Sequence, residues 1–146
     1  MKRKTIILLA FFVAVVVAIV LVYREYNREN LDLAEAAADT EIEAMQLITA
    51  YEKSDTTADA EYRNKILLVS GKIKTLDTAA DRYTIVLGDE ASMSSVRCLI
   101  DSKYLNQASG LSVGQSVKIR GAITGFKKDD LGIGSDVELN RCVVVK

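Results

Sequence analysis

The sequence predicts a mainly β protein with added helices: a five-stranded closed barrel, preceded by an amphipathic helix and an N-terminal transmembrane helix. Three observations in the 146 residues lead to this fold class. An uncharged apolar run opens the chain, apolar residues then recur at every third or fourth position, and from residue 65 they alternate with polar ones. These patterns are typical of a membrane helix, a surface helix and half-buried strands, respectively. We expect three divisions, at residues 1–26, 27–64 and 65–146.

The first element is the apolar run at residues 5–22, which contains no charge, glycine or proline. Its length is close to the roughly 20 residues that cross a hydrocarbon core as a helix. Lys2, Arg3 and Lys4 precede the run, whereas Tyr23 and Arg24 follow it. A basic start and an interfacial tyrosine are typical of a single-pass helix with a cytoplasmic N-terminus. We therefore expect residues 5–23 to lie in the cytoplasmic membrane and the C-terminal domain to lie outside the cytoplasm.

Two alternatives to an uncleaved anchor are a cleaved signal peptide and a buried helix of a soluble protein. A signal peptide has an apolar core of about 7–15 residues, followed by a cleavage site with small residues. This run is longer, and the Tyr-Arg-Glu-Tyr sequence after it offers no such site. The sequence therefore favours an uncleaved signal-anchor.

The second element is an amphipathic helix, expected over residues 27–54. Its apolar stripe recurs at steps of three or four residues and comprises Leu31, Ala34, Ala38, Ile42, Met45 and Ile48. Such a stripe packs on another apolar surface. We expect that surface to be the barrel, with a dimerising helix as the alternative. A short helix is expected at residues 57–63, with Asp55 or Thr56 as its N-cap.

Five strands follow, at residues 66–76, 83–87, 96–100, 115–126 and 136–145. They are rich in β-branched residues, and apolar and polar side chains alternate along them. The residues of the third strand that should face inward are Val96, Cys98 and Ile100. Polar residues 101–109, ended by Gly110, predict a short helix between the third and fourth strands. The alternation breaks at Asn140 and Arg141, which predicts a β-bulge in the fifth strand.

Glycine recurs in the middle of the first and fourth strands, at Gly71 and Gly121. Both stand in an apolar-x-Gly-x-Ile segment, which ends at Ile73 and Ile123. A glycine inside a strand weakens it unless the strand must bend or bulge there, and closing a small five-stranded sheet requires such bends. Five strands, a helix between the third and fourth, and these glycines together indicate an OB-fold.

Charge and composition argue against several classes of function. The chain carries 19 basic and 20 acidic residues; five basic and two acidic ones lie in the first 30, so residues 31–146 have a net charge of −4. Nucleic-acid-binding domains usually present a basic face instead. The chain contains no histidine, which is the commonest general base and metal ligand. We therefore expect no enzymatic activity, no metal site, no cofactor and no small-molecule substrate.

Two cysteines, Cys98 and Cys142, lie in the predicted third and fifth strands, which are neighbours in an OB-fold. Adjacent strands are about 4.8 Å apart, within the Cα separations that a disulfide tolerates. An exported domain would allow the bond to form. A structural disulfide is therefore one expectation and a pair of buried free thiols is the other. A redox-active pair is disfavoured because no partner motif is present.

A ligand face is expected where OB-folds bind single strands, on the second and third strands between the first–second and fourth–fifth loops. The residues there that could stack on bases or meet phosphates are Arg82, Tyr83, Arg97, Phe126, Lys127 and Lys128. They are few, and Asp129 and Asp130 follow the lysine pair at once. The sequence therefore favours solvated loops over a nucleic-acid site.

A set of motifs spans most of residues 45–146: Ala50-Tyr51-Glu52, Tyr62-x-x-Lys65, Val69-x-Gly71-x-Ile73, Val96-x-Cys98, Leu111-x-x-Gly114-Gln115-x-Val117-x-Ile119-x-Gly121 and Leu139-x-x-Cys142. In these motifs the chain resembles the tRNA_anti-like family. The resemblance implies an OB-fold in a bacterial membrane-anchored or exported protein with no established reaction. The expected function is a non-enzymatic binding or assembly module of the cell envelope that recognises a protein or a glycan. The alternative is a single-stranded nucleic-acid-binding protein.

Overall fold

The computed structural model describes residues 3–26, 32–79 and 82–145. The chain forms two compact units, Met1–Asp32 and Leu33–Lys146. The first holds helix α1 (Arg3–Tyr26). Among the residues that the structure describes, no helix combines the length and the hydropathy that a membrane crossing requires. The transmembrane part of the fold prediction is therefore not confirmed.

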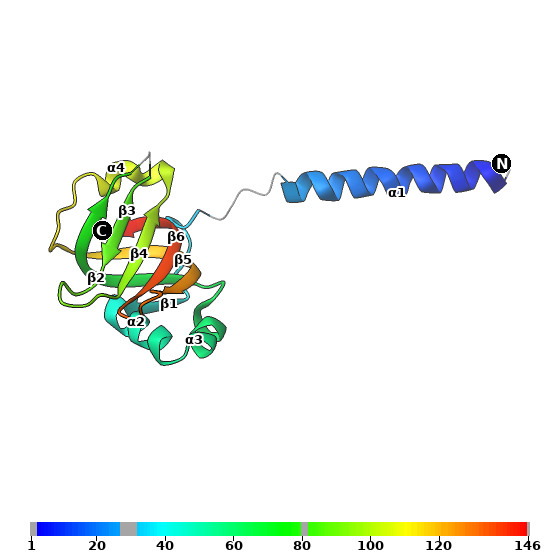
Figure 1. The fold of residues 1–146 in the computed structure, drawn as a ribbon. Coiled ribbons are helices and arrows are strands. Elements are labelled where there is room, and N and C mark those ends of the chain that lie inside the picture. The colour runs from blue at the N-terminus through cyan, green and yellow to red at the C-terminus, as the bar shows by residue number, and fades with distance from the viewer. Residues whose placement is uncertain (1–2, 27–31, 80–81, 146) are drawn as a thin grey trace. The chain divides into compact units, whose positions relative to one another are not determined.

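The second unit is a β-barrel with helices at its ends (Figure 1). Its strands are β1 (Thr40–Glu43), β2 (Ile66–Asp77), β3 (Thr84–Leu87), β4 (Ser95–Ile100), β5 (Ser116–Lys128) and β6 (Ser135–Val145). They form one six-stranded sheet in the order β1-β2-β3-β4-β6-β5, and pairing of β2 with β5 closes it. Strands β2 to β6 are the five predicted strands, so the OB-fold barrel is confirmed.

Strand β1 is a correction to the helix predicted over residues 27–54. Residues 27–31 lie outside the described residues, and residues 32–39 form turns and irregular structure. β1 then pairs in parallel with β2, from Thr40 beside Leu67 to Glu43 beside Ser70. Because β5 holds the other edge of the same β2 residues, β1 covers an edge that would otherwise be unpaired. Tertiary pairing thus overrides the local helical pattern.

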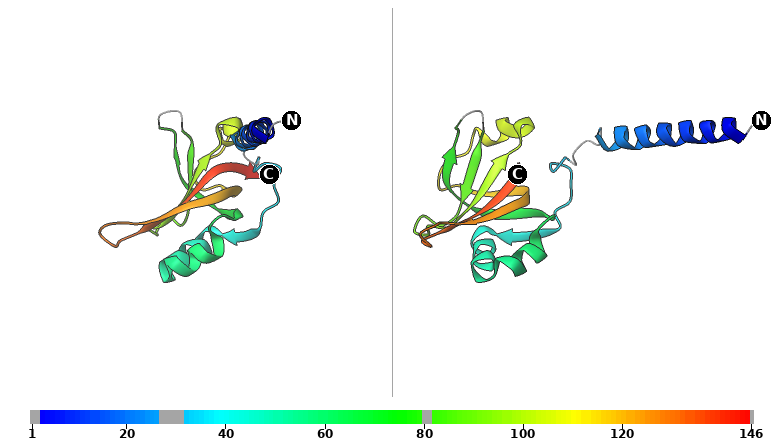
Figure 2. Two further views of the ribbon diagram at one scale, coloured as in Figure 1. Left: turned by 90° about the vertical axis from the view of Figure 1, so that its right-hand side faces the viewer. Right: turned by 45° about the vertical axis from the view of Figure 1, so that its right-hand side comes forward.

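Helices close both ends of the barrel (Figures 1 and 2). At one end lie α2 (Ala44–Lys53) and α3 (Asp55–Tyr62), and at the other lie the 3₁₀-helix η1 (Ser102–Tyr104) and α4 (Leu105–Ala108). The helix predicted at residues 101–109 is therefore split into two short pieces. Ser54, rather than Asp55 or Thr56, caps α3, because its hydroxyl accepts the Thr57 N–H at 3.3 Å.

The core lies between α2 and the inner face of the strands. Helix α2 contributes Leu47, Ile48 and Tyr51, each at most 1% exposed. The predicted inward residues of β4 are buried as expected: Val96, Cys98 and Ile100. The lead-in therefore packs on its own barrel, as predicted, but only its part in α2 does so as a helix.

The predicted bulge in β6 is confirmed. The β4–β6 register shifts between Cys98, which pairs with Leu139, and Ile100, which pairs with Cys142, so β6 has one extra residue there. Arg141 within the bulge has φ of 53°, in the left-handed region.

The two mid-strand glycines are explained by close approach of their neighbours. A Cβ on Gly121 would lie 2.6 Å from the Cys142 sulfur, and one on Gly71 would lie 3.0 Å from the Ala44 Cβ. A methyl group at Gly121 would therefore require its surroundings to move.

Arg120 on β5 fastens the segment that enters the barrel unit. Its Nη1 donates to the carbonyl oxygens of Leu33 (3.0 Å) and Ala34 (2.9 Å). Leu33 is itself only 2% exposed. The chain is thus bound to the barrel before its first strand begins.

Candidate binding surfaces

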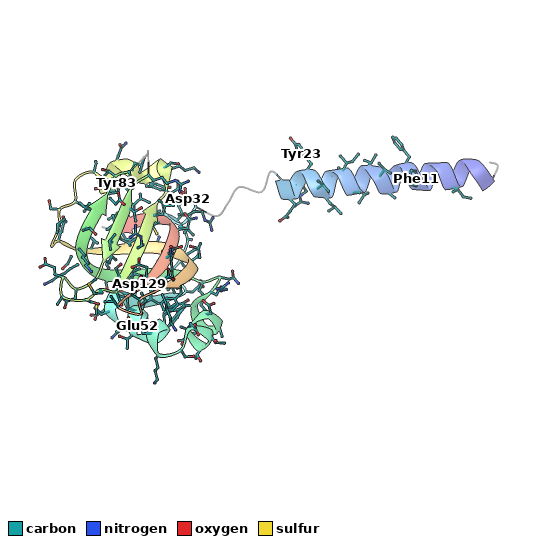
Figure 3. The ribbon with its side chains drawn as sticks, in the orientation of Figure 1. Phe11, Tyr23, Asp32, Glu52, Tyr83 and Asp129 are labelled. Atoms are coloured by element: carbon teal, nitrogen blue, oxygen red, sulfur yellow. The ribbon has the colours of Figure 1, made fainter. Side chains whose placement is uncertain are left out.

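The residues predicted to form one ligand face lie in three separate places. Arg97 is in the middle of β4, Arg82 and Tyr83 precede β3, and Phe126 to Lys128 end β5. Figure 3 shows Tyr83 at the α4 end of the barrel, whereas Asp129, which follows Lys128, lies at the opposite end near Glu52 of α2. The structure therefore does not bring these six residues together.

Arg97 is surrounded by carboxylates. Its guanidinium lies 4.0 Å from an Asp77 oxygen and 3.9 Å from an Asp136 oxygen. The strand register also places Glu138 directly beside Arg97 on β6. A phosphate would have to displace these partners and approach three acidic groups. The outer β3–β4 face is therefore poorly suited to a polyanion.

The two aromatic residues of the predicted face serve the fold instead. The Phe126 ring packs on the Tyr51 ring, with centroids 4.9 Å apart. The Tyr83 hydroxyl donates to the Ala108 carbonyl oxygen at 3.0 Å and so ties β3 to α4. Neither ring is offered as a flat, exposed platform for a base.

The two lysines at the end of β5 have different surroundings. Lys128 lies 5.7 Å from the centroid of the Phe126 ring and 3.8 Å from an Asp55 oxygen. The pKa of Asp55 is lowered, first by the hydrogen bond from the Thr56 N–H and then by Lys128. Lys127 and Arg82 are exposed. Lys128 is exposed as well, so the structure leaves three of the predicted cations on the surface, Arg82 at one end of the barrel and the two lysines at the other.

A polar network, which the sequence reasoning missed, joins α2 to the strands. The Glu52 carboxylate accepts hydrogen bonds from the Ser94 hydroxyl (2.5 Å) and the Ser135 hydroxyl (2.9 Å). The Ser135 N–H in turn donates to the Ser94 hydroxyl at 3.1 Å. Both serines are 5% exposed. Because these polar groups satisfy one another's hydrogen bonds, the network holds α2 to the strands. The sequence reasoning missed it because no local motif links three residues so far apart.

A groove of about 1080 Å³ lies on the described barrel unit. It runs from the start of α2 across the middle of β2 to the start of β5 and the end of β6. Its apolar lining comprises Ala44, Met45, Ile73, Leu111, Val117, Val144 and Val145. Its charged lining comprises Glu43, Lys72, Asp89, Glu90 and Lys118. None of the described residues that line the groove is aromatic, and sequence reasoning did not anticipate it because its walls come from distant segments.

The polar part of the groove follows the β2–β5 ladder. The register sets Ser70 beside Lys118 and Lys72 beside Ser116, so these four side chains share the outer face of the sheet. Lys118 pairs with Glu41 at 2.5 Å. The groove thus combines an apolar wall with a rim that carries both signs of charge.

The two cysteines are free thiols in the structure, and both are fully buried. Burial raises the pKa of Cys142, and contact with the Cys98 thiol raises it further. Their strands are adjacent, as predicted, and run parallel, with Cys98 beside Leu139 and Cys142 beside Ile100. The disulfide is not formed in this structure and stays a prediction. Among the described residues, no group of three or more acidic or cysteine side chains could hold a metal ion.

Comparison with solved structures supports the fold. A Klebsiella pneumoniae lipoprotein to which nucleic-acid binding has been ascribed matches with a TM-score of 0.55 and 21% identity, over 81% of this chain and 100% of that one. Asparaginyl-tRNA synthetase from Pyrococcus horikoshii matches with a TM-score of 0.40 and 17% identity, over 59% of this chain and 21% of that one. The likeness to the Klebsiella lipoprotein, at 21% identity, shows the fold alone. A comparison with curated proteins finds no match.

The sequence itself assigns the family. The family model described as tRNA_anti-like matches residues 1–133. This match covers most of the chain, including the lead-in, β2 to β5 and the loop that follows β5. The protein is therefore a member of the tRNA_anti-like family of OB-fold proteins.

Proposed function

We propose that this protein is a non-enzymatic binding module of the bacterial cell envelope and that its ligand is a segment of another protein. In this proposal, residues 5–23 hold the protein at the cytoplasmic membrane and the barrel lies outside the cytoplasm. The observation that carries the proposal is the groove beside α2 and β2, with its volume of about 1080 Å³. Ligand sites of this size usually combine an apolar lining with a few polar groups that fix orientation.

The lining favours a protein segment over the other ligand classes. Val117, Leu111 and Val144 offer apolar area on which side chains can be buried. The cations Lys72 and Lys118 and the carboxylates of Glu43, Asp89 and Glu90 can pair with either sign of charge on a polypeptide. Single-stranded nucleic acids are instead held by stacking on aromatic rings, which the described lining of the groove lacks.

Site-specific photocrosslinking in cells tests this proposal. A photoreactive phenylalanine derivative would replace Ser116, which is exposed and lines the groove, or Thr75, which is exposed beside the β3–β4 face. We expect a discrete protein adduct from position 116 and none from position 75. Lys72→Glu should weaken the adduct while leaving the melting temperature nearly unchanged, because Lys72 lines the groove and its side chain is exposed. Equal adducts from both positions would contradict the proposal.

The alternative function, single-stranded nucleic-acid binding, is favoured by the likeness to the Klebsiella lipoprotein. Fluorescence anisotropy with labelled DNA and RNA oligonucleotides separates the two functions. The alternative requires saturable binding that weakens steeply between low and physiological salt and is reduced by Arg97→Ala or by Lys127→Ala with Lys128→Ala. We expect no saturable binding, because Arg97 lies between Asp77 and Asp136.

A further inference from the structure

The bulge in β6 decides where Cys142 points. Leu139 faces the core, so strict alternation would turn Arg141 inward and Cys142 outward. The extra residue reverses this order, and Cys142 is fully buried whereas Arg141 is only half-buried. The bulge holds Arg141 at φ of 53°, and the Arg141 N–H donates to the Asn140 side-chain oxygen at 2.7 Å. Backbone in this region is costly for residues other than glycine, so the local geometry is maintained against strain.

Residues on two other strands surround the Cys142 side chain. Cys98 on β4 points inward, and its thiol is close enough to hydrogen-bond the Cys142 thiol. On β5, the missing side chain of Gly121 leaves room for the Cys142 sulfur, which would lie 2.6 Å from a Cβ there. Three features on three strands therefore bring the two sulfur atoms together.

We propose that Cys98 and Cys142 form a disulfide while the barrel folds, and that the bond then crosslinks the parallel pair β4 and β6. For the protein in the cell, this inference rests on the extracytoplasmic location in the proposed function, since disulfides persist in oxidising compartments. The oxidant is a small or protein disulfide. One thiolate attacks it and releases one thiol, and the second thiolate then attacks the mixed disulfide and releases the other. Two protein thiols are oxidised and one oxidant disulfide is reduced to two thiols.

The reaction belongs to folding rather than to the folded state. Both cysteines are 0% exposed, so no oxidant can reach either sulfur once the barrel has closed. The raised pKa of Cys142 also keeps its thiol protonated, and only the thiolate attacks a disulfide. The bond is therefore a structural crosslink and not a reversible switch.

Refolding of the full chain in detergent tests the inference. The denatured, reduced chain is refolded with oxidised glutathione, denatured again without reductant, and treated with a thiol-specific mass tag. We expect complete loss of both tags and a mass lower by two hydrogen atoms. The already folded, reduced chain in the same oxidised glutathione should keep both tags. Cys98→Ser and Cys142→Ser should each leave one thiol, which either is tagged or carries one glutathione.

Two glycine variants sharpen the test. Gly121→Ala places a methyl group against the Cys142 sulfur and should lower the fraction of disulfide formed. Gly110→Ala, where no described atom lies within 4 Å of the added carbon, should form it as the original chain does. Two tags on a natively refolded chain would overturn the disulfide and leave the groove proposal untouched. A refolded chain that oxidises, although the chain extracted from cells is reduced, would instead overturn the extracytoplasmic location.

Discussion

The two ends of the barrel are closed in different ways. At one end, α2 inserts Leu47, Ile48 and Tyr51, which are at most 1% exposed. At the other end, α4 buries Ala108 fully, whereas Leu105 remains half-buried. Helix α4, between β4 and β5, therefore adds little to the core. The N-terminal lead-in supplies most of the apolar side chains that close the barrel.

The polar contacts of α2 and α4 also differ between the two ends of the barrel. Helix α2 is tied to the strands through Glu52, which accepts hydrogen bonds from Ser94 and Ser135. Helix α4 is tied to β3 by the Tyr83 hydroxyl. The lead-in is thus an integral part of the barrel unit, and four predictions probe this difference between the two ends.

The largest effect is expected for Leu47→Ala. Truncation of this fully buried side chain should lower the free energy of unfolding by about 3–5 kcal/mol, because a cavity replaces well-packed atoms. The matched change at the other end, Leu105→Ala, should cost about 1 kcal/mol, since the residue is only half-buried. Urea unfolding followed by circular dichroism measures both. Equal losses would refute the difference between the ends.

The second prediction concerns alkaline pH. Burial, followed by the hydrogen bond to Asp59, raises the pKa of Tyr51. A tyrosine in the unfolded chain titrates near pH 10, so above that pH only the unfolded state releases the proton. Stability should then fall as pH rises, by at most about 1.4 kcal/mol per pH unit.

Tyr51→Phe should flatten this alkaline loss, although it also removes the bond to Asp59. The measurement is urea unfolding between pH 9 and 11 in a Cys142→Ala background, because the pKa of the buried thiol is raised as well. If the slope of stability against pH is unchanged by Tyr51→Phe, the tyrosine does not carry the effect.

The third prediction is a loss of about 1–2 kcal/mol for Ser135→Ala, because Glu52 loses one hydrogen bond and the Ser94 hydroxyl loses a neighbour. Ser112→Ala, at an exposed serine after α4, should change stability by less than about 0.5 kcal/mol. Thermal unfolding of the two variants provides the comparison, and an effect of the same size at both serines would argue against the network.

The smallest effect is expected at the cap of α3. Ser54→Ala should cost about 1 kcal/mol, whereas Ser54→Gly should cost only a few tenths, as is usual at this position. The order Ala worse than Gly, seen in urea midpoints, would identify the capping bond to Thr57 as the cause.

The sequence was sufficient to predict the strands of the barrel because alternation is a local signal. It failed at β1, where Thr40–Glu43 lie within an alanine-rich helical pattern and become a strand only through pairing with β2. It also failed at the ligand face. Phe126 and Arg97 have side chains suited to a nucleic-acid ligand. In the folded chain, however, the Phe126 ring packs on Tyr51 and the Arg97 guanidinium pairs with Asp136. Contacts between distant segments, including those that form the groove, carry no local signature.

The two hydrogen bonds from Arg120 to the segment before β1 have a mechanical consequence. Any tension applied to the chain ahead of Leu33 reaches the barrel first through the two hydrogen bonds from Arg120 to the Leu33 and Ala34 carbonyls. Tension reaches the β1–β2 ladder only after these bonds yield, and it reaches the closed strands only after β1 separates. A protein that binds through the barrel while its N-terminus is held would therefore lengthen in steps before the closed strands bear the load.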